Sequence, residues 1–469
     1  MREELRIQLL QKLATGPKTA KELAALLGVS QPTISRVIGA LGDQIVSLGR
    51  GRATKYARPR PVRGTTSVFP VCRIDEAGNA HPLGVLRTLA GGQYWWQPEG
   101  PDHENRLFDH LPWFVQDMRP DGFVGRAFAQ RLGMELSLPA KLNDWTDDDV
   151  LLALSRRGED HIGNLVLGDE SIARYLQSAQ KPPPAIPEPA RQQTYVELAN
   201  AAMAGDPAGS SAGGEQPKFA AVLKDGDGFR HVLVKFSPPL TSLEGRRWAD
   251  LFHCEHLALE TVQAAGIDAA SSRILEAGQR VFLEVDRFDR IGTLGRSSLF
   301  SLRSIDSEYV GTGADWAKCA GGLLRAGVIS ADNARKMRWL KAFGDLIGNT
   351  DMHLGNLSLI RVRSKSYRLA PVYDMLPMLY RPVSGETPGR KFAPHAMTMD
   401  TADVWPSALQ SALRFWDMAS IEPGVSGEFR RTCCDNLAVL SSLEAGPRIS
   451  REIPTDPFDG PGRSRGHCS

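Results

Sequence analysis

The stretch Gly348-Asn-Thr-Asp351-Met-His-Leu-Gly-Asn356, followed by Leu369-Ala-Pro-Val-Tyr-Asp374, decides the fold of this chain. It places the carboxylate of Asp351 five residues before the carboxamide of Asn356, and the carboxylate of Asp374 another 18 residues on. Phosphoryl transfer from ATP uses such a set, because one Asp holds the proton of the nucleophile while an Asn and another Asp hold magnesium. The spacing D-x-x-x-x-N is kept although its neighbours differ from those of the main protein kinases. The pattern predicts a kinase-like core that uses ATP and Mg²⁺.

A loop of small residues and a basic strand end lie upstream of this stretch. The segment Ser210–Lys218 (Ser-Ser-Ala-Gly-Gly-Glu-Gln-Pro-Lys) precedes two apolar runs, 219–223 and 231–236, joined by a hairpin turn over 225–228. Lys235 comes near the end of the second run, where a rigid strand would hold its charge against the α- and β-phosphates. Taken alone, Lys235 fits an ordinary charged strand end better. The ordered series of loop, lysine and catalytic acids favours the kinase interpretation.

Two further segments fit a kinase core. The helix expected over about 246–265 offers Glu255 and Glu260 as the glutamate that pairs with Lys235, and the pairing logic favours Glu255. After the next buried strand, the segment from Asp286 to Phe288 would cross between the two lobes and offer backbone groups to adenine. Asp351 and Asp374 are expected to follow an apolar helix and an apolar strand, so that a rigid scaffold holds both loops.

The first part of the chain is basic. Residues 1–65 contain 12 Lys/Arg and 4 Asp/Glu, a balance of +8, so the remaining chain carries −6 of the +2 total. Helices are expected over 5–14, 19–27 and 30–41, and a basic hairpin over 45–56. Thr19 and Glu22 form a capping-box pattern at the start of the second helix, and Gly28 makes the turn after it. This order predicts a winged helix-turn-helix with duplex DNA as its partner. The alternative is a three-helix protein-binding module with a solvated basic hairpin.

The DNA-contacting residues can be named from these positions. Side chains early in the third helix would reach base edges, and those of the hairpin would contact phosphates. The first group is Gln31, Thr33, Ser35 and Arg36, and the second is Arg50, Arg52 and Lys55.

The composition of the chain limits the class of protein, its location and the chemistry of its cysteines. The chain of 469 residues is 42% hydrophobic and 23% charged, as in ordinary globular proteins. It shows neither an apolar run of membrane-spanning length nor an apolar signal core, so we expect a cytoplasmic protein without a membrane partner. The six cysteines form no CxxC pair, and a disulfide scaffold or zinc site is not expected.

The expected fold class is α+β: a two-lobed protein-kinase-like core with an N-terminal winged helix-turn-helix domain. A mixed α/β subdomain, a proline-rich connector over 180–192 and a disordered Gly/Pro-rich tail complete the chain. The expected boundaries are 1–63, 66–200, 201–440 and 441–469.

These motifs are similar to those of the HipA-like serine/threonine kinases, the toxin half of bacterial toxin–antitoxin pairs. The likeness spans about 66–440 and is carried by the two stretches quoted first and by Ser-Ala-Gly-Gly-Glu-Gln-Pro-Lys218, Val-Lys235-Phe and Val-Asp-Arg-Phe-Asp-Arg290. The resemblance implies a loop serine, Ser211 or its neighbour Ser210, whose autophosphorylation ejects the phosphate-binding loop and silences the enzyme. It also implies a protein substrate, which in the family is an aminoacyl-tRNA synthetase, and an antitoxin partner.

The roles expected in such a kinase are these. Asp351 would orient the substrate hydroxyl and accept its proton, while Asn356 and Asp374 would hold magnesium. The residues expected at ATP are Gly213, Gly214, Lys218, Lys235, Asp286, Phe288 and His353. For His353 a purely structural role is an equal alternative.

Two departures from the family matter for function. The helix-turn-helix, which the family's antitoxin carries on a separate protein, is fused in front of this chain. The segment Ser301–Tyr309 also differs from the Gln/Glu/Asp-rich stretch of the family, which leaves the substrate open. The main hypothesis is a serine/threonine protein kinase with its own DNA-binding domain for autoregulation. The alternatives are a transcriptional regulator that uses an inactive kinase fold as a ligand sensor, and a metal-dependent nuclease, in which Lys235 would have no role.

Overall fold

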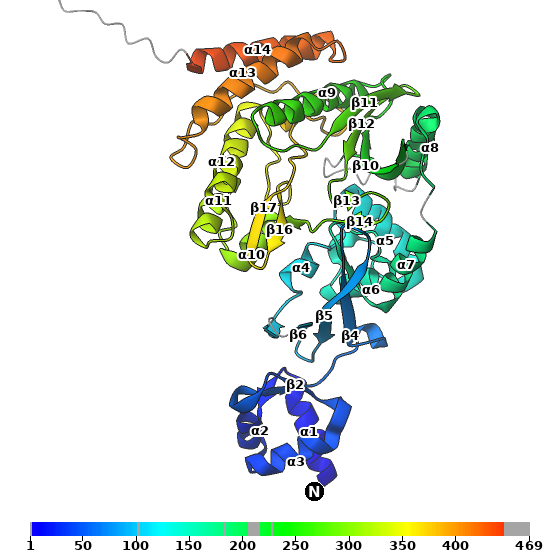
Figure 1. The fold of residues 1–469 in the computed structure, drawn as a ribbon, viewed down its shortest axis with the longest axis vertical. Helices are drawn as coiled ribbons and strands as arrows, with labels where there is room; N and C mark the ends of the chain where they lie inside the picture. The colour runs from blue at the N-terminus through cyan, green and yellow to red at the C-terminus, as the bar shows by residue number, and fades with distance from the viewer. Residues whose placement is uncertain (1, 101–103, 182–183, 205–215, 227, 445–469) are drawn as a thin grey trace, which may run out of the picture.

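The computed structural model describes residues 2–100, 104–181, 184–204, 216–226 and 228–444. Figure 1 shows an elongated molecule with the N-terminal helices at one end, a sheet-containing middle part, and a two-lobed core at the other end. No helix in the described part of the chain is long and apolar enough to cross a membrane.

The N-terminal part is a winged helix-turn-helix, as the sequence predicts. Thr19 and Glu22 form the expected capping box at the start of the second helix, and Gly28 ends that helix with a left-handed φ of 64°. Apolar side chains from the three helices make one small core. The elements are α1 (Arg2–Leu13), β1 (Lys18–Thr19), α2 (Ala20–Leu27), α3 (Gln31–Leu41), β2 (Val46–Leu48) and β3 (Lys55–Ala57), with the strand order β1-β3-β2.

The middle part is an antiparallel sheet with short helices. Its strand order is β7-β6-β5-β4-β8, and α4 to α7 belong to the same part of the chain. The strands are β4 (Val68–Ile74), β5 (Ala80–Thr88), β6 (Tyr94–Pro98), β7 (Arg106–Phe108) and β8 (Leu165–Leu167). The helices are α4 (Trp113–Gln116), α5 (Gly122–Leu136), α6 (Asp147–Arg157) and α7 (Asp169–Gln180).

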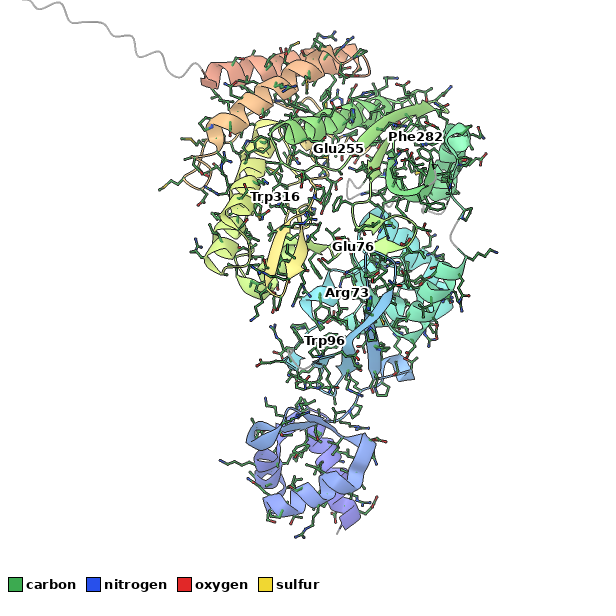
Figure 2. The ribbon with its side chains drawn as sticks, viewed as in Figure 1. Arg73, Glu76, Trp96, Glu255, Phe282 and Trp316 are labelled. Carbon is green, nitrogen blue, oxygen red and sulfur yellow. The ribbon has the colours of Figure 1, made fainter. Side chains whose placement is uncertain are left out.

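The smaller lobe of the core is a four-stranded antiparallel sheet between two helices. The order is β11-β12-β10-β9, with β9 (Lys218–Asp225), β10 (Gly228–Phe236), β11 (Ser272–Ala277) and β12 (Arg280–Asp286). Tyr195 of α8 (Arg191–Ala204) packs on one face against Phe219 and Phe282, the latter labelled in Figure 2. The expected boundary at 200 therefore falls inside a helix that packs with this lobe. On the other side, α9 (Leu243–Ala264) contacts β11 and β12.

The proline-rich connector does more than link the two parts. Ile186 forms a parallel bridge with Leu223, and its N–H donates to the carbonyl of Val222 over 2.8 Å. The connector thereby extends the edge of the small-lobe sheet at β9.

The larger lobe consists of helices around a three-stranded sheet, order β15-β16-β17. The strand expected to run to Tyr373 ends at Leu369, since Pro371 cannot donate to a ladder and Val372 instead bridges Ala269. The elements are β13 (Arg290–Ile291), β14 (Gly295–Arg296), β15 (Phe300–Ser301), α10 (Leu302–Tyr309), α11 (Trp316–Arg325), α12 (Ala331–Leu346), β16 (Ser358–Arg363), β17 (Ser366–Leu369), α13 (Trp405–Ile421) and α14 (Gly427–Glu444). The tail predicted from residue 441 is wrong for 441–444, which continue α14; the remainder lies outside the described residues.

Candidate active site

Lys235 lies at the centre of the site. Its Nζ donates to Oε1 and Oε2 of Glu255 at 2.6 and 2.7 Å, and also to Oδ1 of Asp374. Glu255 comes from α9, where Figure 2 labels it, and Asp374 follows the strands of the larger lobe. Glu260 points elsewhere, 3.5 Å from His256, so the preference for Glu255 is confirmed. One lysine therefore joins the two lobes.

Burial and charge act against each other in this group. Burial raises the pKa of Asp374, but the charges of Lys235 and Lys218 outweigh it and leave that pKa at about 2. Burial also acts to lower the pKa of Lys235, and its two carboxylate partners raise it above the usual value instead. At neutral pH, Asp374 is an anion and Lys235 a cation.

Lys218 lies beside this group, as expected of an ATP-binding residue. It is the register partner of Lys235 across β9 and β10, so the two side chains leave the sheet on the same face. The loop residues expected to cover the phosphates, Gly213 and Gly214, and the expected phosphoserine Ser211 with Ser210, lie outside the described residues.

The catalytic loop is held by carboxamides. Nδ2 of Asn356 donates to the carbonyl oxygen of Asp351 at 2.9 Å and to its Oδ2 at 3.4 Å. Asn349 connects this loop to Asp374: its Oδ1 accepts from the N–H of Asp351 at 3.0 Å, and its Nδ2 donates to the carbonyl oxygen of Asp374 at 3.3 Å. The structure thus brings the three predicted residues together.

Asn349 is a residue that sequence reasoning missed. It is only 4% exposed and connects the loops of both acids. The available signal was a carboxamide two residues before Asp351 in the opening motif, a position where a short polar side chain can bond backbone nearby.

The backbone of Asp374 is in an unusual conformation. Its φ is 53°, in the left-handed region that residues other than glycine rarely adopt. Such a conformation costs about 1–3 kcal/mol and persists where the surroundings fix it. Here the carbonyl bond from Asn349 and the ion pair with Lys235 fix it, so the carboxylate direction is set before any ligand arrives.

The first turn of α10 supports the catalytic loop from behind. The N–H groups of Leu302 and Arg303 donate to the carbonyls of Leu357 and Leu354, at 2.7 and 3.0 Å. In turn, the carboxylate of Asp117, from the middle part of the chain, accepts from Ser301 and Ser304. The segment Ser301–Tyr309, which departs from the family pattern, is therefore a support of the loop.

Asp351 and His353 line a cavity of about 510 Å³. Its wall includes the ion pair of Lys341 with Asp345, 2.5 Å between Nζ and Oδ2, and the side chain of Lys391. Nδ1 of the exposed His353 accepts from the N–H of Gly355 at 3.0 Å. A hydroxyl-bearing substrate could reach Asp351 through this cavity.

The expected adenine contacts lie at the crossing between the lobes. Asp286 and Phe288 line a separate cavity of about 270 Å³. The N–H of Asp286 already donates to the carbonyl of Ser271 at 2.9 Å, so its carbonyl and the backbone of Phe288 remain for a base. The Phe288 ring lies 5.8 Å from that of Tyr373, which precedes Asp374.

The residues expected at DNA lie on the winged helix. Gln31, Ser35 and Arg36 are exposed on α3, which Figure 1 shows at the end of the molecule away from the core. Thr33 is half-buried, and its hydroxyl is 2.9 Å from that of Ser30, the cap of α3.

The wing is only partly free for phosphates. Arg50 and Lys55 are exposed, and the side chain of Arg52 lies outside the described residues. Arg60 and Arg63 bind Asp148 and Asp149 of α6. These two charges of the basic front part are neutralised within the protein.

Comparison with known proteins locates all three parts. Residues 3–44 match the model of bacterial regulatory proteins of the arsR family, residues 65–176 that of the middle domain of YjjJ-like toxins, and residues 210–438 that of the HipA-like C-terminal domain. The toxin YjjJ of Escherichia coli (strain K12) is 36% identical over 427 residues, which is 90% of this chain and 95% of that protein.

Two solved structures are more distant. The HipA of Shewanella oneidensis MR-1, solved with HipB and its operator DNA, has a TM-score of 0.46 at 14% identity and covers 79% of this chain and 96% of its own. The Helicobacter pylori proinflammatory kinase CtkA has a TM-score of 0.33 at 16% identity and covers 48% and 88%. Neither likeness assigns a residue, substrate or partner to this chain.

Proposed function

The chain belongs to the family of YjjJ-like and HipA-like toxins with an N-terminal helix-turn-helix, and from this premise we propose that it is an ATP- and Mg²⁺-dependent serine/threonine protein kinase. The observation that carries the proposal is the buried lysine shared between Glu255 and Asp374, next to the loop of Asp351 and Asn356. This is the arrangement that a protein kinase needs before it can transfer phosphate.

Each residue has one role in the proposed reaction. Asp351 orients the hydroxyl of the substrate and accepts its proton. Lys235, positioned by Glu255, binds the α- and β-phosphates of ATP, and Lys218 adds charge on the same face. Transfer itself needs little covalent chemistry from the protein, since positioning and charge supply most of the catalysis.

The donor set fits magnesium. Lys235 binds Oδ1 of Asp374, and Asn356 uses its Nδ2 on Asp351, so Oδ2 of Asp374 and Oδ1 of Asn356 keep free lone pairs among the described residues. Oxygen atoms of carboxylate and carboxamide groups are the ligands that this ion prefers. The described residues contain no cluster of three or more His, Cys, Asp or Glu suited to a metal, which agrees with an ion that takes its other ligands from nucleotide phosphates and water. When bound, magnesium neutralises charge on the phosphates.

The kinase proposal is tested by transfer from γ-labelled ATP to the protein itself and to proteins of a cell lysate. Asp351→Asn and Asp374→Asn should each lower transfer by on the order of 10³ or more, because they remove the proton acceptor and a magnesium ligand. Asp332→Asn is the matched control, since Asp332 lies exposed on α12, and among the described residues its one ion pair is with Lys336. Transfer at the wild-type rate in either active-site variant would remove its role.

The same assay distinguishes the kinase from a regulator that has an inactive kinase fold. Such a protein binds Mg-ATP without transferring phosphate, so nucleotide binding by a wild type that lacks transfer would favour it. A nuclease would degrade DNA without ATP, and that activity should be lost in Asp351→Asn if the alternative holds.

Self-silencing by autophosphorylation is part of the proposal. A phosphate on Ser211 would add about −1.5 to −2 charge in a loop expected over the ATP phosphates and would repel the nucleotide. Mass spectrometry of protein incubated with Mg-ATP should find the phosphate on Ser211, with Ser210 as the alternative. Phosphate at other positions and none at these two refutes this part.

The winged helix is proposed to bind duplex DNA, which would place the enzyme at its own operator for autoregulation. Its support is the match of residues 3–44 to a bacterial regulator model and the exposed polar face of α3. Arg50→Ala should weaken binding to all sequences and flatten the salt dependence, since each phosphate contact adds a slope of about −0.9. Arg36→Ala should change sequence preference instead. If the full chain gives no mobility shift at low salt, the proposal that it binds DNA is wrong.

An antitoxin and an aminoacyl-tRNA synthetase remain the proposed protein partners, to be sought by co-purification and in the lysate assay.

A further inference from the structure

An exposed arginine, Arg303, lies beside the loop of Asp351 and Asn356. The N–H of Arg303 donates to the carbonyl of Leu354 at 3.0 Å, which fixes its position on α10 against the loop. A Cβ built on Gly355 would lie 3.2 Å from Nη2 of Arg303, so the guanidinium reaches over the residue that precedes Asn356. The side chain is exposed, and within the described ranges no hydrogen bond or ion pair engages its guanidinium.

A histidine meets this guanidinium on the same side of the loop. The Cβ built on Gly355 would also lie 2.9 Å from Cε1 and 3.0 Å from Nδ1 of His353, too close for any side chain larger than glycine's without a shift. Because Nδ1 accepts from the N–H of Gly355, the neutral ring carries its hydrogen on Nε2. The absence of a side chain at Gly355 thus lets the imidazole of His353 and the guanidinium of Arg303 lie above one point of the backbone.

The charges nearby do not occupy the arginine. Asp351 is bonded to Asn356, and Asp374 to Lys235. The charge of Arg303 acts on the buried carboxylate of Asp117, which is itself bonded to Ser301 and Ser304. No carboxylate of the described residues forms an ion pair with the guanidinium, so it is available for an anion that arrives with a ligand. Its planar fork matches the oxygen atoms of a phosphoryl group or a carboxylate.

We propose that Arg303 and His353 form an anion-binding pair at the catalytic loop, with Arg303 as the main contact. Its ligand is the oxyanion of the phosphoryl group being transferred or an acidic side chain next to the acceptor hydroxyl of the substrate. This rests on the proposed kinase function. Proximity to Asn356, the expected magnesium ligand, favours the phosphoryl group as the source.

Nucleotide binding distinguishes the two sources without any catalysis. Arg303→Gln should weaken binding of Mg-ATP by roughly 10- to 100-fold, the worth of a hydrogen bond to a charged group, and leave binding of Mg-ADP unchanged. Arg303→Lys should recover part of the loss, because it keeps the charge but not the fork. Arg335→Gln on α12 is the matched control, an exposed arginine for which the described residues offer no partner. Thermal unfolding checks that each variant is folded.

Transfer measurements complete the test. In the other outcome, Arg303→Gln changes the binding of neither Mg-ATP nor Mg-ADP. If it then lowers transfer to a serine peptide with flanking glutamates more than transfer to a peptide with flanking alanines, the pair binds the acidic group of the substrate. If binding, transfer to both peptides and autophosphorylation all match Arg335→Gln, the proposal is overturned. A wild type that neither binds Mg-ATP nor transfers phosphate would instead refute the proposed function.

Discussion

At the scale of single residues, Lys235 holds the site in a charged state that is ready for a cation. One ammonium group faces the carboxylates of Glu255 and Asp374. Burial raises the pKa of Glu255, and Lys235 acts to lower it. For the proposed magnesium site, the low pKa of Asp374 matters more than the pKa of Glu255. A carboxylate that serves as a magnesium ligand has to be anionic and to have a fixed direction.

The low pKa of Asp374 gives a pH-dependent stability. It is about 2 in the folded protein, against about 3.9 for an unperturbed Asp. The unfolded state therefore binds more protons between these values, so the carboxylate stabilises the fold above about pH 4 and loses that contribution as the pH falls toward 2. The shift corresponds to about 2–3 kcal/mol.

Urea unfolding of wild type and Asp374→Asn should show this difference in the free energy of unfolding at pH 5, and the difference should shrink as the pH is lowered through 4 and 3. Asp332→Asn, at an exposed position, should differ from wild type by the same small amount throughout. A gap for Asp374→Asn that does not change with pH would contradict the assigned pKa.

At the scale of elements, the loop of Asp351 and Asn356 depends on α10, a helix whose contact with the loop is not visible in the sequence motifs. Two N–H groups at the start of α10 donate to carbonyls of the loop. Asp117, from the middle part of the chain, accepts from Ser301 and Ser304 at the same end of α10. Burial raises the pKa of Asp117, and the three donors act against this. The contact gives the middle part a direct mechanical link to the loop of Asp351.

Replacing Asp117 should therefore affect catalysis from outside the kinase core. Asp117→Ala leaves the donors of Ser301 and Ser304 without their acceptor, which costs about 1–3 kcal/mol of stability. We expect kcat for phosphoryl transfer to fall about tenfold or more with KM for ATP unchanged, since a loop shift of about 1 Å can cost 10²-fold. Asp121→Ala, which removes the cap of α5 in the same part of the chain, is the control and should leave kcat unchanged. Equal kcat in both variants would show that Asp117 is structural only.

The sequence predicted the elements whose signals are local. The capping box at Thr19, the turn at Gly28 and the apolar helix before Asp351 depend on neighbours in the chain, and each is where the pattern places it. Two long-range bridges could not be predicted from the sequence. The bridge of Ile186 adds the connector to the edge of a sheet, and the bridge of Val372 ends a strand early. In the site, Asp351, Asn356 and Asp374 follow from spacing, whereas Asn349 and the support from Asp117 depend on contacts between distant segments.

At the scale of the whole molecule, the winged helix-turn-helix is fixed to the rest of the chain by its wing. Leu48 and Ala57 of the wing are buried with Leu89 and Trp95 of the middle sheet. A Cβ on Gly91 would lie 2.8 Å from Cα of Gly16, so the backbones of the two parts come close. Figure 1 shows α3 at the end of the molecule away from this contact, and Gln31, Ser35 and Arg36 are exposed on it.

This contact should hold the winged helix in one orientation in solution. Leu48 is 4% exposed, and Leu48→Glu would place an unpaired charge in the apolar contact, which is costly enough to separate the two parts. The radius of gyration from small-angle X-ray scattering should then rise, and protease cleavage between residues 57 and 67 should become faster. Leu26→Glu is the matched control, because Leu26 on α2 is already 51% exposed. Trp95→Ala loosens the contact from the other side and leaves the core of the winged helix intact, so it separates loss of docking from unfolding of that domain. Because α3 takes no part in the contact, DNA affinity should change little in Trp95→Ala. If Leu48→Glu and Trp95→Ala both have the radius of gyration and the cleavage rate of the control, the two parts already move independently in the wild type.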